Sequence, residues 1–137
     1  MGMAKLADST VPDYEAQPQP FSDAESPIDL VHLSRQTFGD HDLERELLAL
    51  FDTQAAQVAA RLRAPAASGD SDWRIALAHT IKGSARAIGA FEVGQAAEAY
   101  EQALRSEDPN AGDRSDDLGA ALNKARSAIA QLLGGAG

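Results

Sequence analysis

The sequence predicts an all-α protein, built as an up-down-up-down four-helix bundle with a short extra helix at its N-terminal end. Of the 137 residues, 44% are apolar, and aromatic residues make up only 5%. The richness in alanine and leucine favours helices. Apolar side chains recur at helical spacing, and no segment alternates polar and apolar residues as a strand does. Short connections between the segments favour antiparallel neighbours, as in a bundle.

The first expected helix is short. Ser26 can cap it, Pro27 suits its first position, Asp29 suits its positive end, and it stops near Gly39. Four longer helices follow, each bounded by residues that begin or end helices. They are expected over about 40–62, 71–88, 91–105 and 115–133.

Two of the longer segments carry an apolar stripe that should face a shared core. In the first of them the stripe consists of Leu43, Leu47, Phe51, Val58 and Leu62. In the last it consists of Leu118, Leu122, Ala125, Ile129 and Leu132. Gly89 is expected to end the helix over 71–88, and Asp108-Pro109 is expected to end the helix over 91–105. Residues 106–114 are predicted to form a polar loop before the last helix.

Composition and charge limit the function. Residues 1–25 are acidic and proline-containing and are expected to form a flexible tail, whereas residues 26–134 should form one domain. The net charge of −9 argues against nucleic-acid and anionic-membrane partners. The absence of cysteine excludes disulfides and thiolate chemistry. Because no apolar run could span a bilayer and no signal core is visible, we expect a cytoplasmic protein.

The segment over 71–88 has two chemically different faces. With residues about 100° apart around the axis, His79 lies roughly 180° from the centre of the apolar face. That apolar face is expected to consist of Trp73, Leu77, Ile81, Ser84 and Ile88, with Ala85 at its edge. The outer face around His79 gathers Ile75, Lys82, Gly83 and Arg86. This is an unusual position for a structural histidine and a suitable one for a histidine that another protein must reach.

The chemistry of these residue types indicates group transfer. A neutral imidazole nitrogen can accept a phosphoryl group at neutral pH. Lys82, one turn after His79, can balance the negative charge that such a group adds. Glycine inside a helix costs about 1 kcal/mol relative to alanine, so Gly83 requires a reason, and room for an incoming protein supplies one.

These residues resemble the histidine-containing phosphotransfer (HPt) domain family. The resemblance covers about residues 28–133 and depends on His79, Lys82, Gly83, Ser84, Ala85 and Gly89, with support from Phe38-Gly39 and the run Leu47 to Phe51. It implies a phosphorelay intermediate that is phosphorylated on His79, is supported by Lys82 and gives access at Gly83. It also implies exchange with receiver-domain aspartates and a hybrid histidine kinase, with Mg²⁺ and most of the catalysis supplied by the receiver.

Further expectations follow for the site and its alternatives. The partner is expected to contact Ile75, Gly83 and Arg86. The chain should be a monomeric phosphocarrier rather than an enzyme, and it should hold no cofactor or metal.

A second cluster, Asp40-His41-Asp42, is interpreted as the start of a helix rather than as a metal site, and His41 is expected to take no part in it. Two alternatives stay open: a phosphoacceptor module separated from a larger kinase, and a helical adaptor that binds receivers without phosphate turnover.

Overall fold

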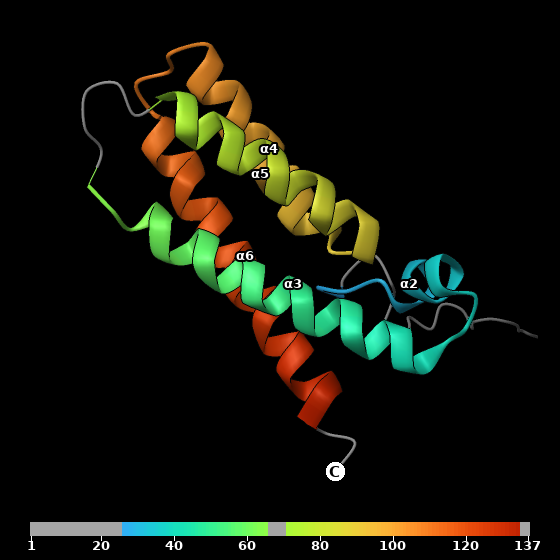
Figure 1. Ribbon diagram of the computed structural model, residues 1–137. Coiled ribbons are helices and arrows are strands. Elements are labelled where there is room, and N and C mark those ends of the chain that lie inside the picture. Colours follow the sequence, from blue (N-terminus) through green and yellow to red (C-terminus); the bar gives the residue numbers. More distant parts are fainter. Residues whose placement is uncertain (1–25, 66–70, 135–137) are drawn as a thin grey trace, which may run out of the picture.

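The computed structural model describes residues 26–65 and 71–134, and all regular secondary structure in these residues is helical (Figure 1). The helices, in chain order, are α2 (Leu30–Thr37), α3 (His41–Leu62), α4 (Ser71–Ile88), α5 (Phe91–Arg105) and α6 (Ala111–Gly134). The predicted all-α fold is confirmed. The predicted tail over residues 1–25 lies outside the described residues.

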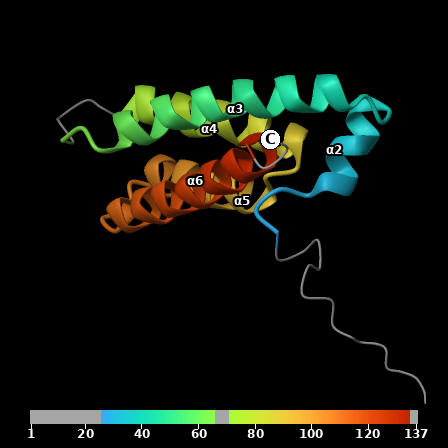
Figure 2. The same ribbon diagram turned by 90° about the horizontal axis from the view of Figure 1, so that it is seen from below.

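The four long helices form the predicted bundle. Each packs on the next in the order α3, α4, α5, α6, and α6 closes the arrangement against α3. Successive helices run in opposite directions (Figure 1). The shorter α2 lies at the end of the bundle where α3 begins and α4 ends, and it packs on both (Figure 2). The most extensive helix–helix interface is the one between α4 and α5.

The start of α2 differs from the prediction. Asp29, rather than Ser26, caps this helix, and its side chain accepts the backbone N–H of His32 at 3.0 Å. The Ser26 hydroxyl instead donates to the carbonyl of Ile28 at 2.7 Å. Ile28 is fully buried, so it anchors the chain immediately before the helix.

The turn between α4 and α5 holds α2 in place. Gly89, the predicted helix stop, has a φ of +91°, which suits glycine. Its carbonyl accepts the backbone N–H of Asp29 at 2.9 Å. A Cβ atom at Gly89 would lie 2.7 Å from the Asp29 carbonyl oxygen. The glycine therefore allows both the turn and the close approach of the two backbones.

The last helix begins earlier than predicted, at Ala111 instead of Ser115. The Asp108 side chain accepts the backbone N–H of Asn110 at 2.8 Å, and the Asp108 carbonyl accepts that of Ala111 at 3.0 Å. These bonds start the helix within the expected polar loop. The predicted stripe of α6 is buried at Leu118, Leu122, Ala125 and Ile129 and half-buried at Leu132.

The buried face of α3 is rotated from the predicted stripe. Phe51 and Val58 are buried as predicted, whereas Leu43 is 38% exposed and Leu47 and Leu62 are half-buried. The other buried positions of α3 are Leu48, Ala55 and Ala59. Because α3 packs against α4, α6 and α2, its buried face is set by three neighbours rather than by its leucines alone.

Candidate functional site

His79 lies near the middle of α4 and projects outward, with 65% of its side chain exposed. The predicted outward orientation of the ring is therefore confirmed. The buried face on the other side of α4 is rotated from the predicted arc. It consists of Arg74, Ala78, Ile81, Ala85 and Ile88. The predicted members Trp73, Leu77 and Ser84 are only half-buried. The dominant contact with α5 accounts for this rotation.

The ring of His79 is held from α5 by Glu101, which the sequence did not single out. The Nδ1 atom lies 3.2 Å from one carboxylate oxygen of Glu101 and 3.4 Å from the other. Only 7% of the Glu101 side chain is exposed. A signal was present, because Glu101 continues the buried series Val93, Ala97 at a spacing of four residues. An acid at a core position requires a partner.

Three basic side chains surround this carboxylate. Lys82 Nζ lies 2.9 Å from Glu101 Oε1, and Arg105 donates to Oε2 at 2.8 and 3.1 Å. His79 completes the set. Burial alone would raise the pKa of Glu101, but the hydrogen bonds from Lys82 and Arg105 outweigh it and lower the pKa to about 2. Glu101 is therefore ionised at neutral pH.

An ionised Glu101 decides which nitrogen of His79 is available. A carboxylate can only accept hydrogen bonds, so Nδ1 must carry the proton and donate it. The lone pair then belongs to Nε2, which makes no hydrogen bond to any described residue. The exposed ring therefore offers one nucleophilic nitrogen in a fixed orientation.

Lys82 differs from a freely solvated cation. Its side chain is only 17% exposed, and its ammonium group is paired with Glu101. Arg105 was not identified from the sequence. Its side chain is 59% exposed, lies one turn after Glu101 on α5 and pairs with the same carboxylate. The site thus holds two cations beside the histidine. Both are paired with one carboxylate, so the three groups together keep one net positive charge.

Gly83 is exposed, and a Cβ atom built there would meet nothing within 4 Å. No packing contact of the described residues therefore requires a glycine at this position. Ile75, predicted to be exposed, is half-buried and lines an open pocket of about 590 Å³ together with Arg105 and Asp72. The side chain of Ile75 is thus only partly available as contact surface.

Arg86 does not join the network around His79. Its guanidinium group pairs with Glu98 on α5, and its aliphatic part packs over Gly94. A Cβ atom at Gly94 would lie 3.1 Å from Arg86 Cγ, so Gly94 makes room for this side chain. The contact role expected for Arg86 stays a prediction.

The histidine in the acidic cluster at the start of α3 has a local role. Asp40 caps the helix by accepting the backbone N–H of Leu43 at 3.1 Å. His41 is not a bystander, because its Nδ1 atom pairs with Glu44 at 3.0 Å. This hydrogen bond raises the pKa of His41. No group of three metal-ligating side chains occurs within residues 26–65 and 71–134.

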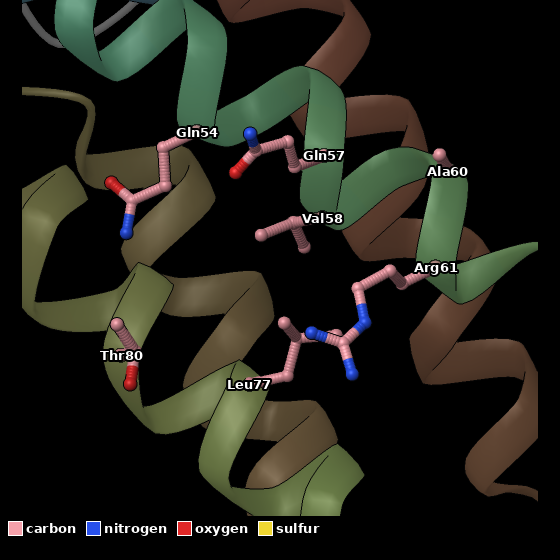
Figure 3. A pocket seen from close by; sticks show the side chains of 7 residues that line it. All are labelled: Gln54, Gln57, Val58, Ala60, Arg61, Leu77 and Thr80. Atoms are coloured by element: carbon pink, nitrogen blue, oxygen red, sulfur yellow. The ribbon is translucent and has the colours of Figure 1, made fainter.

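An open groove of about 450 Å³ separates the surfaces of α3 and α4 (Figure 3). Its lining comes from Gln54, Gln57, Val58, Ala60 and Arg61 on α3 and from Leu77 and Thr80 on α4. Thr80 is the residue after His79, so the groove runs beside the candidate site. The groove is mainly apolar and gathers no cluster of reactive groups.

The fold and the site define a helical bundle that presents an exposed imidazole ring on its side, next to a buried carboxylate and the two cations paired with it. The chain belongs to the Hpt domain family, whose family model matches residues 46–134. Neither a curated protein nor a solved structure matches the chain significantly. Members of this family are phosphocarriers that transfer phosphoryl groups through a histidine in phosphorelays and interact with receiver domains. Among the described residues, no helix is long and apolar enough to cross a membrane.

Proposed function

We propose that this chain carries a phosphoryl group on Nε2 of His79 between a hybrid histidine kinase and the aspartates of receiver domains. The observation that carries the proposal is the exposed ring of His79, whose Nδ1 is held by the buried Glu101. This contact fixes the tautomer and leaves Nε2 as the nucleophile.

The transfer step follows from this geometry. The lone pair of Nε2 attacks the phosphorus of an aspartyl phosphate, and a bond between nitrogen and phosphorus forms. The bond between phosphorus and the aspartate oxygen breaks, and the aspartate leaves as a carboxylate. The Nδ1 proton stays on the ring beside Glu101. Transfer to the next receiver is the same step in reverse.

The two partners would divide the work. The receiver would supply Mg²⁺ and most of the catalysis, and this chain would supply the nucleophile, the positive charge of Lys82 and the open space at Gly83. Ile75 and Arg86 would contact the receiver at the edge of this surface. Such a carrier needs no cofactor of its own and can work as a monomer.

Transfer of ³²P from a phosphorylated receiver domain tests the proposal. We expect the wild-type protein to become labelled, and the label to be lost in acid but stable in base, as a phosphoramidate is. His79→Gln should keep the melting temperature, because the ring is exposed and the glutamine amide can replace its hydrogen bond to Glu101, and it should take up no label. Binding of the receiver without labelling would instead support the adaptor function, and equal labelling of His79→Gln would exclude His79 as the acceptor.

A further inference from the structure

Glu101 places a negative charge next to a ring that is to receive a second one. A neutral acceptor such as glutamine could hold the Nδ1 proton equally well in geometric terms. The carboxylate is nevertheless buried at 7% exposure and ringed by Lys82, Arg105 and His79. Its charge therefore calls for a reason beyond the orientation of the ring.

We propose that Glu101 is a positioning residue whose negative charge, beyond its hydrogen bond, makes phosphorylated His79 a ready donor of its phosphoryl group. The inference rests on the proposed phosphorylation of His79 at Nε2. It adds a residue that determines how long the phosphohistidine lasts.

The first argument concerns the ring. When Nε2 is bonded to phosphorus and Nδ1 keeps its proton, the imidazole ring carries a positive charge. A carboxylate 3.2 Å from Nδ1 stabilises this form. When the bond between Nε2 and phosphorus breaks, its electron pair returns to Nε2 and the ring leaves as neutral imidazole. Glu101 thus keeps the ring in its better leaving-group form.

The second argument concerns the cations. Lys82 and Arg105 both lie within 2.9 Å of Glu101 oxygens. A phosphoryl group on Nε2 must compete with Glu101 for these two cations, and the carboxylate also repels it. Protonation cannot remove this competition at neutral pH, because the pKa of Glu101 is lowered to about 2. The two cations therefore stabilise the bound phosphoryl group less than they would if Glu101 were uncharged.

Among the described residues, Glu101 is the only acid that contacts the ring of His79. The charged neighbours along α4 and α5 are Lys82, Arg86, Glu98 and Arg105. Glu98 is bound to Arg86 rather than to the histidine. From α3, the groove beside the site contributes Gln54, Gln57 and the cation Arg61.

The lifetime of the phosphohistidine tests the inference without any partner protein. Phosphoramidate can donate its phosphoryl group to Nε2 with release of ammonia, and ³¹P NMR then follows hydrolysis to inorganic phosphate between pH 5 and 9. Glu101→Gln keeps a hydrogen-bond acceptor but removes the charge. We expect its phosphohistidine to last on the order of tenfold longer at pH 7, which corresponds to about 1.4 kcal/mol in activation free energy.

Two further variants sharpen the test. Glu92→Gln removes one negative charge from the same helix at an exposed position paired with Lys124, and it should leave the lifetime unchanged. Arg105→Gln removes an exposed cation and leaves Glu101 less neutralised, so it should shorten the lifetime. ¹⁵N NMR of the unphosphorylated ring should show that its proton stays on Nδ1 in Glu101→Gln, which shows that the orientation of the ring is unchanged and separates the effect of charge from that of orientation.

The outcomes are distinct. Lifetimes of Glu101→Gln and Arg105→Gln equal to that of the wild type would overturn the inference and leave the proposed function intact. If Glu101→Gln does not fold, an unchanged lifetime in Arg105→Gln alone overturns it. If neither phosphoramidate nor a phosphorylated receiver labels His79 in the wild type, the proposed function fails, and this inference fails with it.

Discussion

At the scale of single residues, the candidate site depends on one acid that the chain buries beside the exposed His79. Glu101 orients His79 and binds both Lys82 and Arg105. A lysine judged from the sequence alone would be a solvated charge with little effect on stability. Because Lys82 instead neutralises a buried carboxylate, it has a structural role in addition to the proposed chemical one.

We therefore expect Lys82→Ala to affect both stability and transfer. Leaving Glu101 with one fewer donor should lower the free energy of unfolding by about 1–2 kcal/mol. Receiver-dependent transfer should slow as well. Urea unfolding and the rate of ³²P transfer measure the two effects. Lys124→Ala removes an exposed lysine paired with Glu92 and is the matched control, expected to change neither.

The double variant Lys82→Ala/Glu101→Gln measures the interaction between these two side chains. Removing the charge of Glu101 should make the loss of Lys82 less costly. The stability losses of the two single variants should therefore sum to more than the loss in the double variant. Strictly additive losses would show that Lys82 does not stabilise the protein through Glu101.

Gly83 tests access to the ring. Because a Cβ atom there would meet nothing, Gly83→Ala should stabilise the helix by up to about 1 kcal/mol. Gly83→Leu should also fold, yet strongly reduce transfer from a receiver, since the added side chain would stand beside His79. Thermal melting and receiver-dependent transfer are the two measurements.

Gly119 provides the control for this pair of variants. It lies within α6, which packs on α3 and α5, and a Cβ atom there also meets nothing within 4 Å. Gly119→Ala should raise stability without affecting transfer. Normal transfer by Gly83→Leu would remove the argument that the glycine provides access.

At the scale of elements, the α4–α5 pair forms the site, and the turn that joins these helices also docks α2. The turn contains Gly89, whose carbonyl bonds the N-cap residue Asp29 of α2. The same short connection therefore sets the α4–α5 packing and the place of the extra helix. The site itself lies further along α4, around His79, so the two functions of the pair can be separated by mutation.

Gly89→Ala should weaken the α2 end of the bundle. The substitution imposes a positive φ on alanine and places Cβ 2.7 Å from a backbone oxygen. A loss of roughly 1–3 kcal/mol in the free energy of unfolding is expected. Amide hydrogen exchange should increase in α2, while phosphoramidate should still label His79. Gly112→Ala, at an open position in α6, should cause no such loss, and equal stability of the two variants would contradict this account.

At the scale of the whole molecule, the buried carboxylate links stability to pH. The pKa of Glu101 is lowered from 4.5 to about 2 in the folded protein. As the pH falls, the unfolded chain binds this proton first, which favours unfolding. The contribution of Glu101 to stability is therefore fully present above about pH 4.5 and is lost as the pH falls toward 2.

Comparison with Glu101→Gln isolates this contribution. We expect the wild type to exceed the variant in free energy of unfolding above pH 4.5, and the difference to shrink between pH 4.5 and 2. Other acids with lowered pKa values, such as Glu44, are common to both proteins and cancel. Urea unfolding at several pH values gives the difference, and a difference independent of pH would show that Glu101 is not stabilised as a carboxylate.

The sequence by itself determined the helical class, the bounds of α4 and α5, and the outward position of His79. These features depend on residues that are close in the sequence. Residues such as Gly89 end a helix, and the helical period places apolar and polar residues on opposite faces. The face of α4 that carries the candidate site could also be predicted, because His79, Lys82 and Gly83 lie within two turns of one helix.

Only the tertiary structure decided which side chains meet across helices. Glu101 lies 22 residues from His79, and its contact depends on how α5 is rotated and placed against α4. The same rotations explain why α3 buries Leu48 while leaving Leu43 exposed, and why Ile75 is half-covered. The periodicity of a single helix predicts an apolar stripe. The number and position of the neighbouring helices decide which residues are buried and which charges are paired.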